Sequence, residues 1–208
     1  MDWALSWPWM ALALLGAYHG LNPGMGWLFA VARGLQESRR SAVFFSLFPI
    51  LIGHEASVVA VAGLAVATQQ LLSPPTVRLI SALVLVAVGV YRISRPRSHP
   101  RGFGMRVGMV GLAAWSFLMA SAHGAGLMVV PVLLGWPVVE ALPALGQMAA
   151  LVLVSTTVHV AAMLVVMATA ALVVYQVVGL RILHRRWFNL DLVWAASLAM
   201  AGLITVFS

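Results

Sequence analysis

The sequence predicts an all-α polytopic membrane protein, with six transmembrane helices arranged as two inverted three-helix repeats and both termini outside. Three observations predict this fold: the composition, the distribution of arginines and the spacing of four histidines. Hydrophobic residues make up 62% of the 208 residues and charged residues only 8%, which is too little charge to cover a soluble domain. Several apolar runs reach the ~20 residues that a helix needs to cross a bilayer. We therefore expect a single transmembrane domain over residues 1–208.

The apolar runs divide the chain into six predicted helices, and local breakers set their ends. Pro23 interrupts the first helix, because proline has no N–H to bond the carbonyl of His19 four residues earlier. Consecutive prolines after Ser73 end the second helix. Because the first run lacks a basic segment, we expect it to be a span rather than a cleaved signal peptide. The predicted helices cover about residues 5–33, 42–72, 76–93, 107–134, 142–178 and 190–207.

The arginines predict the orientation of these helices. With six spans, all but one of the arginines fall in the three loops on one side, and Arg78 alone lies on the other. The positive-inside rule places the three basic loops in the cytoplasm, within a bacterial cytoplasmic (inner) membrane. The loop arginines are Arg33, Arg39, Arg40, Arg92, Arg95, Arg97, Arg101, Arg106, Arg181, Arg185 and Arg186. Because they lie in short loops, the net charge of +7 does not indicate nucleic-acid binding.

An internal repeat supports the inverted arrangement. His19-Gly20 in the first predicted helix is matched by His123-Gly124 in the fourth, and a proline follows each pair, Pro23 and Pro131. The next histidine comes 35 residues later in the first unit and 36 later in the second. We expect repeat 1 at about 1–93, a basic cytoplasmic linker at 94–106 and repeat 2 at about 107–208. Three helices per unit invert the second unit, as in secondary transporters whose site lies near the midplane between repeats.

Four histidines form the candidate site: His19, His54, His123 and His159. Each lies near the middle of its predicted span, where a polar side chain is costly unless it bonds a partner or faces a polar cavity. Any one of them can be structural, bonded to a carbonyl and holding two helices together. Four at equivalent positions favour a shared site instead. Imidazole is a ligand that suits Zn, Cu, Fe and Ni, and the absence of Cys excludes thiolate ligands.

Further residues lie close to these histidines in the sequence. Asn22 shares a helix face with His19 and is either a ligand or the cap of the second half-helix. Met25 offers a soft thioether, although methionine also fills gaps in cores. Glu55, next to His54, orients a ligand, carries a proton or forms an ion pair between helices. We expect Pro23, which interrupts its helix, and Pro131, which follows the second His-Gly pair, to support the site.

The stretch from His19 to Met25 resembles a signature of the nickel/cobalt transporter superfamily. In its urease-associated and nickel/cobalt-efflux members the signature reads His-x-Leu-(Asp/Glu)-Pro-(Asp/Gly)-His, and His19, Leu21, Pro23 and Gly24 match it. The run 53–59, Gly-His-Glu-Ala-Ser-Val-Val, is similar to the second-span motif Gly-His-Ser-x-Val-Val. The resemblance implies a metal site that uses first-span histidines. Here Asn22 and Met25 replace the acid and the second histidine, which makes the site less anionic and softer.

These observations predict a secondary transporter of a transition-metal cation, Ni/Co-like or a softer ion such as Cu. The chain is then not an enzyme and has no prosthetic group, and the metal ion is its substrate. The expected partners are the lipid bilayer and a homo-oligomer or partner subunit. Two alternatives remain open: an exporter of a small organic solute that uses the histidines for proton coupling, and an intramembrane haem or redox protein. An intramembrane metalloenzyme is less favoured, because no second histidine follows His54 in the usual register.

Overall fold

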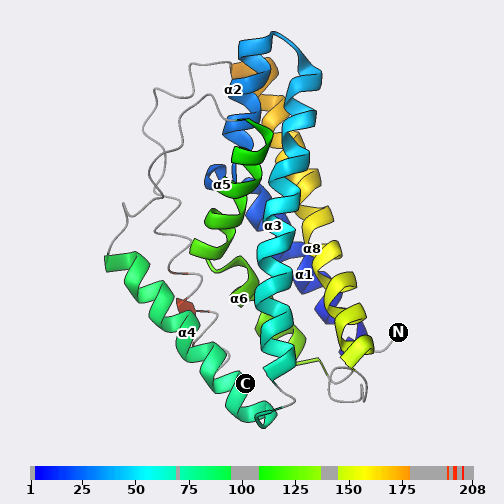
Figure 1. The fold of residues 1–208 in the computed structure, drawn as a ribbon, viewed down its shortest axis with the longest axis vertical. Helices are drawn as coiled ribbons and strands as arrows, with labels where there is room; N and C mark the ends of the chain where they lie inside the picture. The colour runs from blue at the N-terminus through cyan, green and yellow to red at the C-terminus, as the bar shows by residue number, and fades with distance from the viewer. Residues whose placement is uncertain are drawn as a thin grey trace.

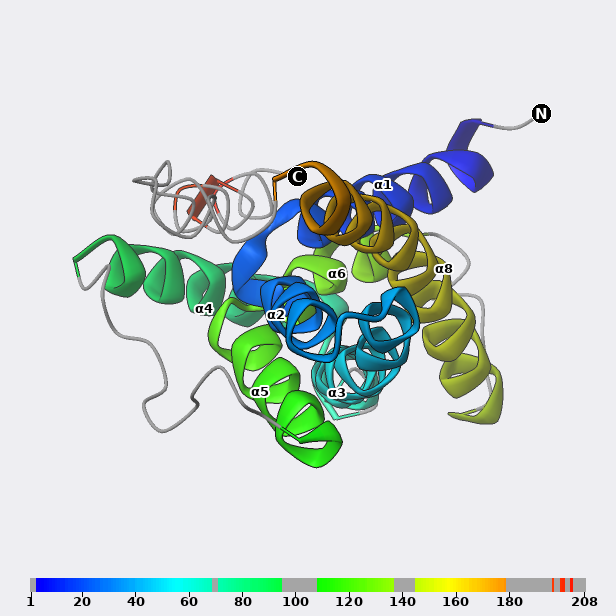
Figure 2. The same ribbon diagram turned by 90° about the horizontal axis from the view of Figure 1, so that it is seen from above.

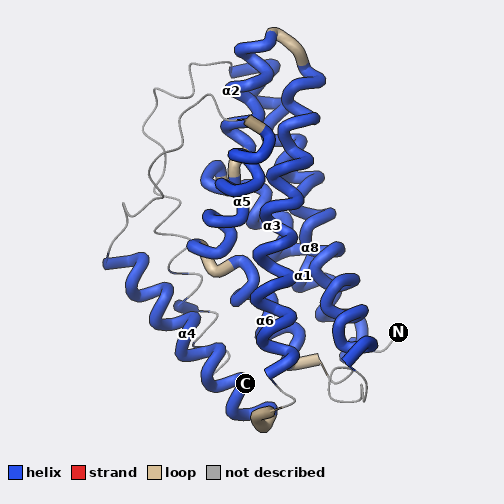
Figure 3. Tube along the Cα trace, viewed as in Figure 1, coloured by secondary structure: helices blue, strands red, loops and turns tan. Residues whose placement is uncertain are grey.

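The computed structural model describes residues 3–68, 71–94, 108–136 and 145–178, with positions 196, 199, 200 and 203 near the carboxyl end. Every element in this part of the chain is a helix (Figure 1; Figure 3). The all-helical class is therefore confirmed. The predicted sixth helix, 190–207, and nearly all of the predicted linker, 94–106, lie outside the described residues.

The first predicted helix is interrupted where Pro23 predicts it. Helix α1 (Trp3–Leu21) is followed by a short 3-10 turn, η1 (Pro23–Met25), and by α2 (Trp27–Glu37). Asn22 leaves the helical conformation, with φ −73° and ψ 117°, and its side-chain oxygen accepts a hydrogen bond from the Gly24 N–H. Gly26 restarts the helix at φ 113°, in the left-handed region that glycine adopts at little cost.

The next two helices agree with the sequence reading. Helix α3 (Arg40–Thr68) has 29 residues and continues through Pro49. At 1.5 Å per residue it is ~44 Å long, which is more than the ~30 Å hydrocarbon core of a bilayer. Helix α4 (Pro74–Ser94) begins directly after Ser73 with a proline at its first position, where the missing N–H costs nothing.

The fourth predicted helix, 107–134, is not continuous as expected but is broken into two. Helix α5 (Met109–Ala122) and helix α6 (Ala125–Leu134) meet at an angle of 55°. The break lies at His123 and Gly124, because Gly124 adopts φ 68°. Pro131, the proline expected to support the site, lies inside α6 without ending it.

The fifth predicted helix is present as α8 (Leu145–Val173), which continues into a π-helical turn, η2 (Val174–Val178). Within the described residues, two helices are long and apolar enough to cross a membrane, Arg40–Thr68 and Gly146–Val177. The bent pair α5–α6 would be a third if it forms one span. These helices are consistent with a membrane protein, while the count of six spans stays a prediction.

The helices alternate in direction along the long axis of the molecule. In Figure 1, α1–α2 and α8 run upward, whereas α3 and α5–α6 run downward. The most extensive contacts join α1 to α8 and α3 to α5, and α4 packs mainly on α6. Figure 2 shows α4 at the periphery of the bundle formed by the other helices. Helix pair α5–α6 therefore runs opposite to α1–α2.

The two largest clusters of buried apolar side chains lie one above the other in the bundle, and two small ones join α4 to α6. The upper core includes Met25, Ile50 and Met163, and the lower core includes Leu12, Val58 and Val152. Helices α3 and α8 each contribute to both cores, whereas α1 contributes to the lower core and is followed by Met25 of η1 in the upper core. In each of these three segments, a histidine lies in the sequence between the lower-core and the upper-core residues. These histidines therefore lie between the upper and the lower apolar core.

Candidate metal centre

Three histidines from three different helices meet between the two cores. His19 comes from α1, His54 from α3 and His159 from α8, and all three are fully buried, with 0% of their surface exposed. One ring nitrogen from each can be chosen so that the three atoms lie within 4.8 Å of one another. We call these residues the histidine trio. They are separated by 35 and 105 residues in the sequence, so the fold alone brings them together.

The rings of the trio are in direct contact. The Nε2 atoms of His54 and His159 lie 3.5 Å apart, and these two rings are stacked with an interplanar angle of 14°. The His19 ring meets both of them edge to face, with centroids 5.3 Å from His54 and 4.8 Å from His159. Such close contacts leave no room for the plane of a macrocycle between any two of these imidazoles.

Backbone carbonyls orient two of the trio. Nδ1 of His19 lies 2.7 Å from the carbonyl oxygen of Leu15, one turn earlier on α1. Nδ1 of His159 lies 3.2 Å from the carbonyl oxygen of Leu12, across the α1–α8 interface. Since a carbonyl only accepts, Nδ1 carries the hydrogen in each ring. Nε2 is then the atom with the lone pair, which is the usual arrangement of a metal-binding histidine.

The spacing of the trio suits a shared cation. Two nitrogens that each lie ~2.0–2.1 Å from one ion are ~3.3–3.6 Å apart at tetrahedral or trigonal angles. The 3.5 Å between Nε2 of His54 and Nε2 of His159 falls in this interval. Nδ1 of His54 is buried without a hydrogen-bond partner, and burying such an atom is costly. The residues present therefore fit an ion that prefers imidazole ligands.

The fourth predicted histidine, His123, is buried but does not belong to the trio. It lies at the carboxyl end of α5, and its Nδ1 donates to the Met119 carbonyl at 2.9 Å. This bond to the carbonyl one turn earlier repeats the bond of His19 to Leu15. The two histidines therefore occupy the same local position, each before the break in its own helix. Only His19 joins the group of ligand atoms within 4.8 Å.

Asn22 and Met25 lie at the helix break rather than among the trio. Asn22 is 5% exposed and caps η1 through Gly24, so the capping role is the one its contacts show. Its Nδ2 is buried without a hydrogen-bond partner. Met25 is fully buried in the upper core, packed with apolar residues such as Ile50 and Met163. Pro23 occupies the first position of η1.

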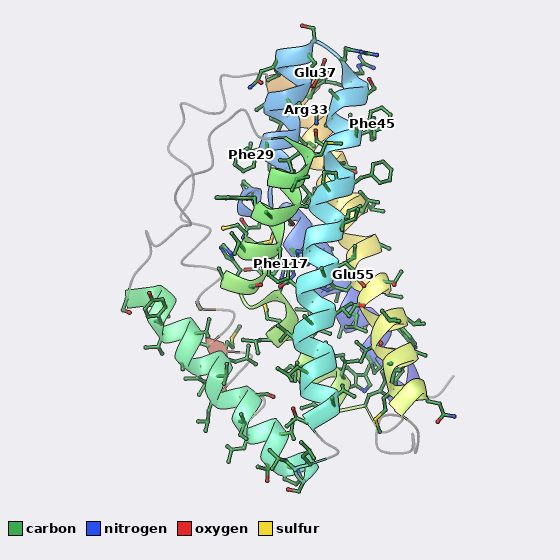
Figure 4. The ribbon with its side chains drawn as sticks, viewed as in Figure 1. Phe29, Arg33, Glu37, Phe45, Glu55 and Phe117 are labelled. Atoms are coloured by element: carbon green, nitrogen blue, oxygen red, sulfur yellow. The ribbon has the colours of Figure 1, made fainter. Side chains whose placement is uncertain are left out.

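Glu55 lies on α3 (Figure 4) and reaches α8. Its Oε1 accepts a hydrogen bond of 2.6 Å from the Thr156 hydroxyl. Its Oε2 is buried with no hydrogen-bond partner. The neighbouring position 54 instead faces the interior, because successive helix residues point ~100° apart. Glu55 thus joins α3 to α8 one residue away from the site, and it is not among the ligand atoms that cluster.

Glycines that were not predicted as site residues set the distance between the helices. A Cβ on Gly16 would lie 1.9 Å from the His159 carbonyl oxygen, and one on Gly20 would lie 2.5 Å from that of Met163. These two glycines are four residues apart, the small-xxx-small spacing that lets membrane helices approach closely. The spacing Gly16-x-x-x-Gly20 was therefore the sequence signal that could have indicated the α1–α8 contact.

A second contact joins the first helix break to α5. Trp115 of α5 donates from its indole Nε1 to the Gly24 carbonyl at 3.3 Å. Gly24 lies in η1, so this bond joins the interruption of the first unit to the first helix of the second unit. The sequence carried no signal for it, since tryptophan in an apolar run is common.

Comparisons with known protein families, with curated proteins and with solved structures find no match for this chain. The site must therefore be interpreted from its own geometry.

Proposed function

We propose that the protein is a membrane transporter whose substrate is a transition-metal cation bound by His19, His54 and His159. The observation that carries the proposal is the convergence of three fully buried imidazoles whose ligand atoms lie within 4.8 Å. Two of the three have Nδ1 directed at a carbonyl, which leaves Nε2 for an ion. A purely structural histidine needs only one such partner, and nothing about that role would gather three of them in one place.

The arrangement of helices supports a transporter of the inverted-repeat type. If α1–α2 corresponds to α5–α6 and α3 corresponds to α8, the two most extensive helix contacts, α1–α8 and α3–α5, are equivalent pairs. Under the same correspondence His54 and His159 are equivalent, and they face each other across the α3–α8 contact. A site near the interface of two repeats, reached through interrupted helices, is typical of secondary transporters.

The proposal includes a distant kinship with the nickel/cobalt transporter superfamily. It rests on His19, Leu21, Pro23 and Gly24 of the first-span signature and on Gly53-His54 of the second. In this proposal the chain lies in a bacterial inner membrane with its basic loops in the cytoplasm. The metal ion enters as substrate, and the driving force comes from an ion gradient or a partner subunit.

The test is metal binding by the purified full chain in lipid nanodiscs. After incubation with Ni, Co, Zn or Cu and removal of free ion, elemental analysis should find one ion per chain for at least one metal. The triple variant His19→Ala/His54→Ala/His159→Ala should bind none, and it should retain the helical circular dichroism of the wild type. Absence of histidine-dependent binding for every metal would overturn the proposal. Flux of the bound metal into proteoliposomes then tests transport itself.

A second function is favoured by the His54–His159 contact itself. If one Nε2 carries a hydrogen, the two rings share a long hydrogen bond at 3.5 Å, and a proton can pass between the repeats through it. The protein would then be an exporter of a small organic solute that uses the histidines for proton coupling. Flux that follows a pH gradient and is unaffected by metal chelators distinguishes this function from metal transport.

A further inference from the structure

The ligand set of the trio carries no negative charge. Its members are three imidazoles, which bind metals in their neutral form. Within the described part of the chain the acidic residues are Glu37 and Glu55. Glu37 forms an exposed ion pair with Arg33 at one end of the bundle, as Figure 4 shows. Glu55 bonds Thr156 and is not in the group of ligand atoms. No described carboxylate therefore coordinates an ion held by the trio.

The surroundings of the trio are apolar above and below. The upper core contributes Ile50 and Met163, and the lower core contributes Leu12 and Val58, all buried. Such surroundings solvate an ion poorly, and the cost of burying an ion is large. In the Born description the free energy of burial rises with the square of the charge. It is therefore about four times as large for a divalent ion as for a monovalent ion of the same size. Neutral imidazoles do not neutralise the charge of either ion.

The number of ligands also favours a monovalent ion. Zn²⁺ is almost always four-coordinate in its protein sites and commonly uses an anionic ligand or a bound water. A d¹⁰ monovalent ion is satisfied by two or three nitrogen ligands, which is the number the trio offers. Imidazole suits copper, and copper in its monovalent state is the softer form.

We propose that the trio discriminates by charge and takes a soft monovalent cation, Cu(I), in preference to Ni(II), Co(II) or Zn(II). This inference rests on the proposed function, because it names the substrate class of that same site. The neutral ligand set and the apolar cores above and below it supply the discrimination. The resemblance to nickel and cobalt transporters implies the opposite preference, and the absence of an anionic ligand in the trio is the reason for the difference.

A designed change of charge tests the cause of the selectivity. Ser155 lies one turn before His159 on the same face of α8 and is fully buried, and its Oγ has no hydrogen-bond partner. Ser155→Asp places a carboxylate beside the trio, whereas Ser155→Asn adds nearly the same volume without charge. The aspartate should raise the affinity for Zn(II) and Ni(II) relative to that for Cu(I), and the asparagine should not.

The experiment measures dissociation constants of the full chain in nanodiscs under anaerobic conditions. Cu(I) is titrated against a colorimetric chelator in the presence of reductant, Ag(I) serves as a monovalent probe without redox chemistry, and Zn(II), Ni(II) and Co(II) are titrated in parallel. Cu(I) should bind at least about 100-fold more tightly than any divalent ion, a difference of about 2.8 kcal/mol. Ag(I) should also bind in a histidine-dependent manner.

The outcomes separate the two proposals. A divalent ion that binds as tightly as Cu(I), with binding lost in the triple histidine variant, overturns the charge selectivity and leaves the metal site standing. No histidine-dependent binding of any ion overturns both. If Ser155→Asp does not fold, the ratio of affinities in the wild type still decides, because it requires no variant.

Discussion

His54 and His159 face each other across the α3–α8 interface, with their Nε2 atoms 3.5 Å apart and their rings stacked. One histidine belongs to each predicted repeat, and the two positions are equivalent in the proposed repeat. A shift of either helix relative to the other changes this distance directly. In the proposed transporter, a movement of α3 against α8 would therefore change the geometry of the ion site through this pair of side chains.

The first prediction separates a site of three histidines from one of four. His54→Ala and His159→Ala should each weaken metal binding by at least about 100-fold, since loss of even an outer partner of a ligand costs about 10–100-fold. His123→Ala should change affinity far less, because His123 is not among the clustered ligand atoms. Isothermal titration with the best-bound metal gives the affinities.

Gel filtration and circular dichroism provide the control that each of these variants folds. An equal loss of affinity in His123→Ala and His54→Ala would contradict a site of three ligands and favour the four histidines that the repeat predicts. His123 is buried at the α5–α6 break, so a moderate loss of thermal stability is expected in its variant even when binding is retained.

The second prediction concerns the glycine that lets α1 approach α8. In Gly16→Ala the new methyl would lie 1.9 Å from the His159 carbonyl oxygen, so the helices must separate. Overpacking of this kind costs about 1–3 kcal/mol. The separation also weakens the bond from His159 to the Leu12 carbonyl. Metal affinity should therefore fall although no ligand has changed.

Gly63→Ala is the matched control for this substitution. A Cβ at Gly63 meets nothing within 4 Å, and alanine in a helix interior is favoured over glycine by about 0.5–1 kcal/mol. This variant should keep its metal affinity and be at least as stable as the wild type by thermal unfolding. If the two alanine variants lose affinity equally, the close α1–α8 contact is not what positions the site.

Much of the fold followed from the sequence because strong local signals set it. Pro23 with Asn22 and Gly26 produces the first interruption, and the prolines after Ser73 mark the α3–α4 turn. The break between α5 and α6 was not predicted, since the fourth helix was expected to be continuous. Proline can be accommodated inside a helix when the packing around it is favourable, as at Pro131, whereas the positive φ of Gly124 ends α5. A lone glycine in an apolar run does not by itself predict that a helix ends there.

The sequence indicated part of the histidine cluster. The spacing of the four histidines predicted a shared site, but sequence spacing does not determine which side chains meet. Three of the four predicted histidines come together, while Asn22, Met25 and Glu55 have other contacts. Their neighbours are supplied by helices distant in the chain, such as Thr156 for Glu55. Only the packing of α1, α3 and α8 decides these contacts.

The third prediction assigns a structural role to the Glu55–Thr156 bond. Thr156→Val removes the hydroxyl that donates to Glu55 at 2.6 Å, and leaving a half-buried carboxylate without its donor should cost about 1–3 kcal/mol of stability. The number of metal ions bound per chain should stay the same, since neither residue is in the trio. Thermal unfolding and elemental analysis measure the two effects.

Thr157→Val is the matched control, because the Thr157 hydroxyl is exposed and donates to the Leu153 carbonyl of its own helix. It should leave both stability and metal content close to those of the wild type. Loss of the bound ion in Thr156→Val, with Thr157→Val normal, would instead show that Glu55 takes part in holding the ion.

The fourth prediction tests the orientation of α3, which follows from the arginine distribution. The chain has no cysteine, so a single introduced thiol reports the side of the membrane on which it lies. Ser41 is exposed at the start of α3 beside the basic residues Arg39 and Arg40, and Leu71 is 85% exposed beyond its other end. In intact cells, a membrane-impermeant maleimide should label Leu71→Cys, and it should label Ser41→Cys only after permeabilisation.

The cysteine-free wild type gives the background for this labelling. The physical reason for the expected pattern is that arginine-rich short loops are retained on the cytoplasmic side, while α3 is long enough to place its two ends on opposite sides of a bilayer. Labelling of Ser41→Cys alone in intact cells would reverse the orientation. Equal labelling of both positions without permeabilisation would mean that α3 does not span the membrane, and a midplane site at His54 would then be lost with it.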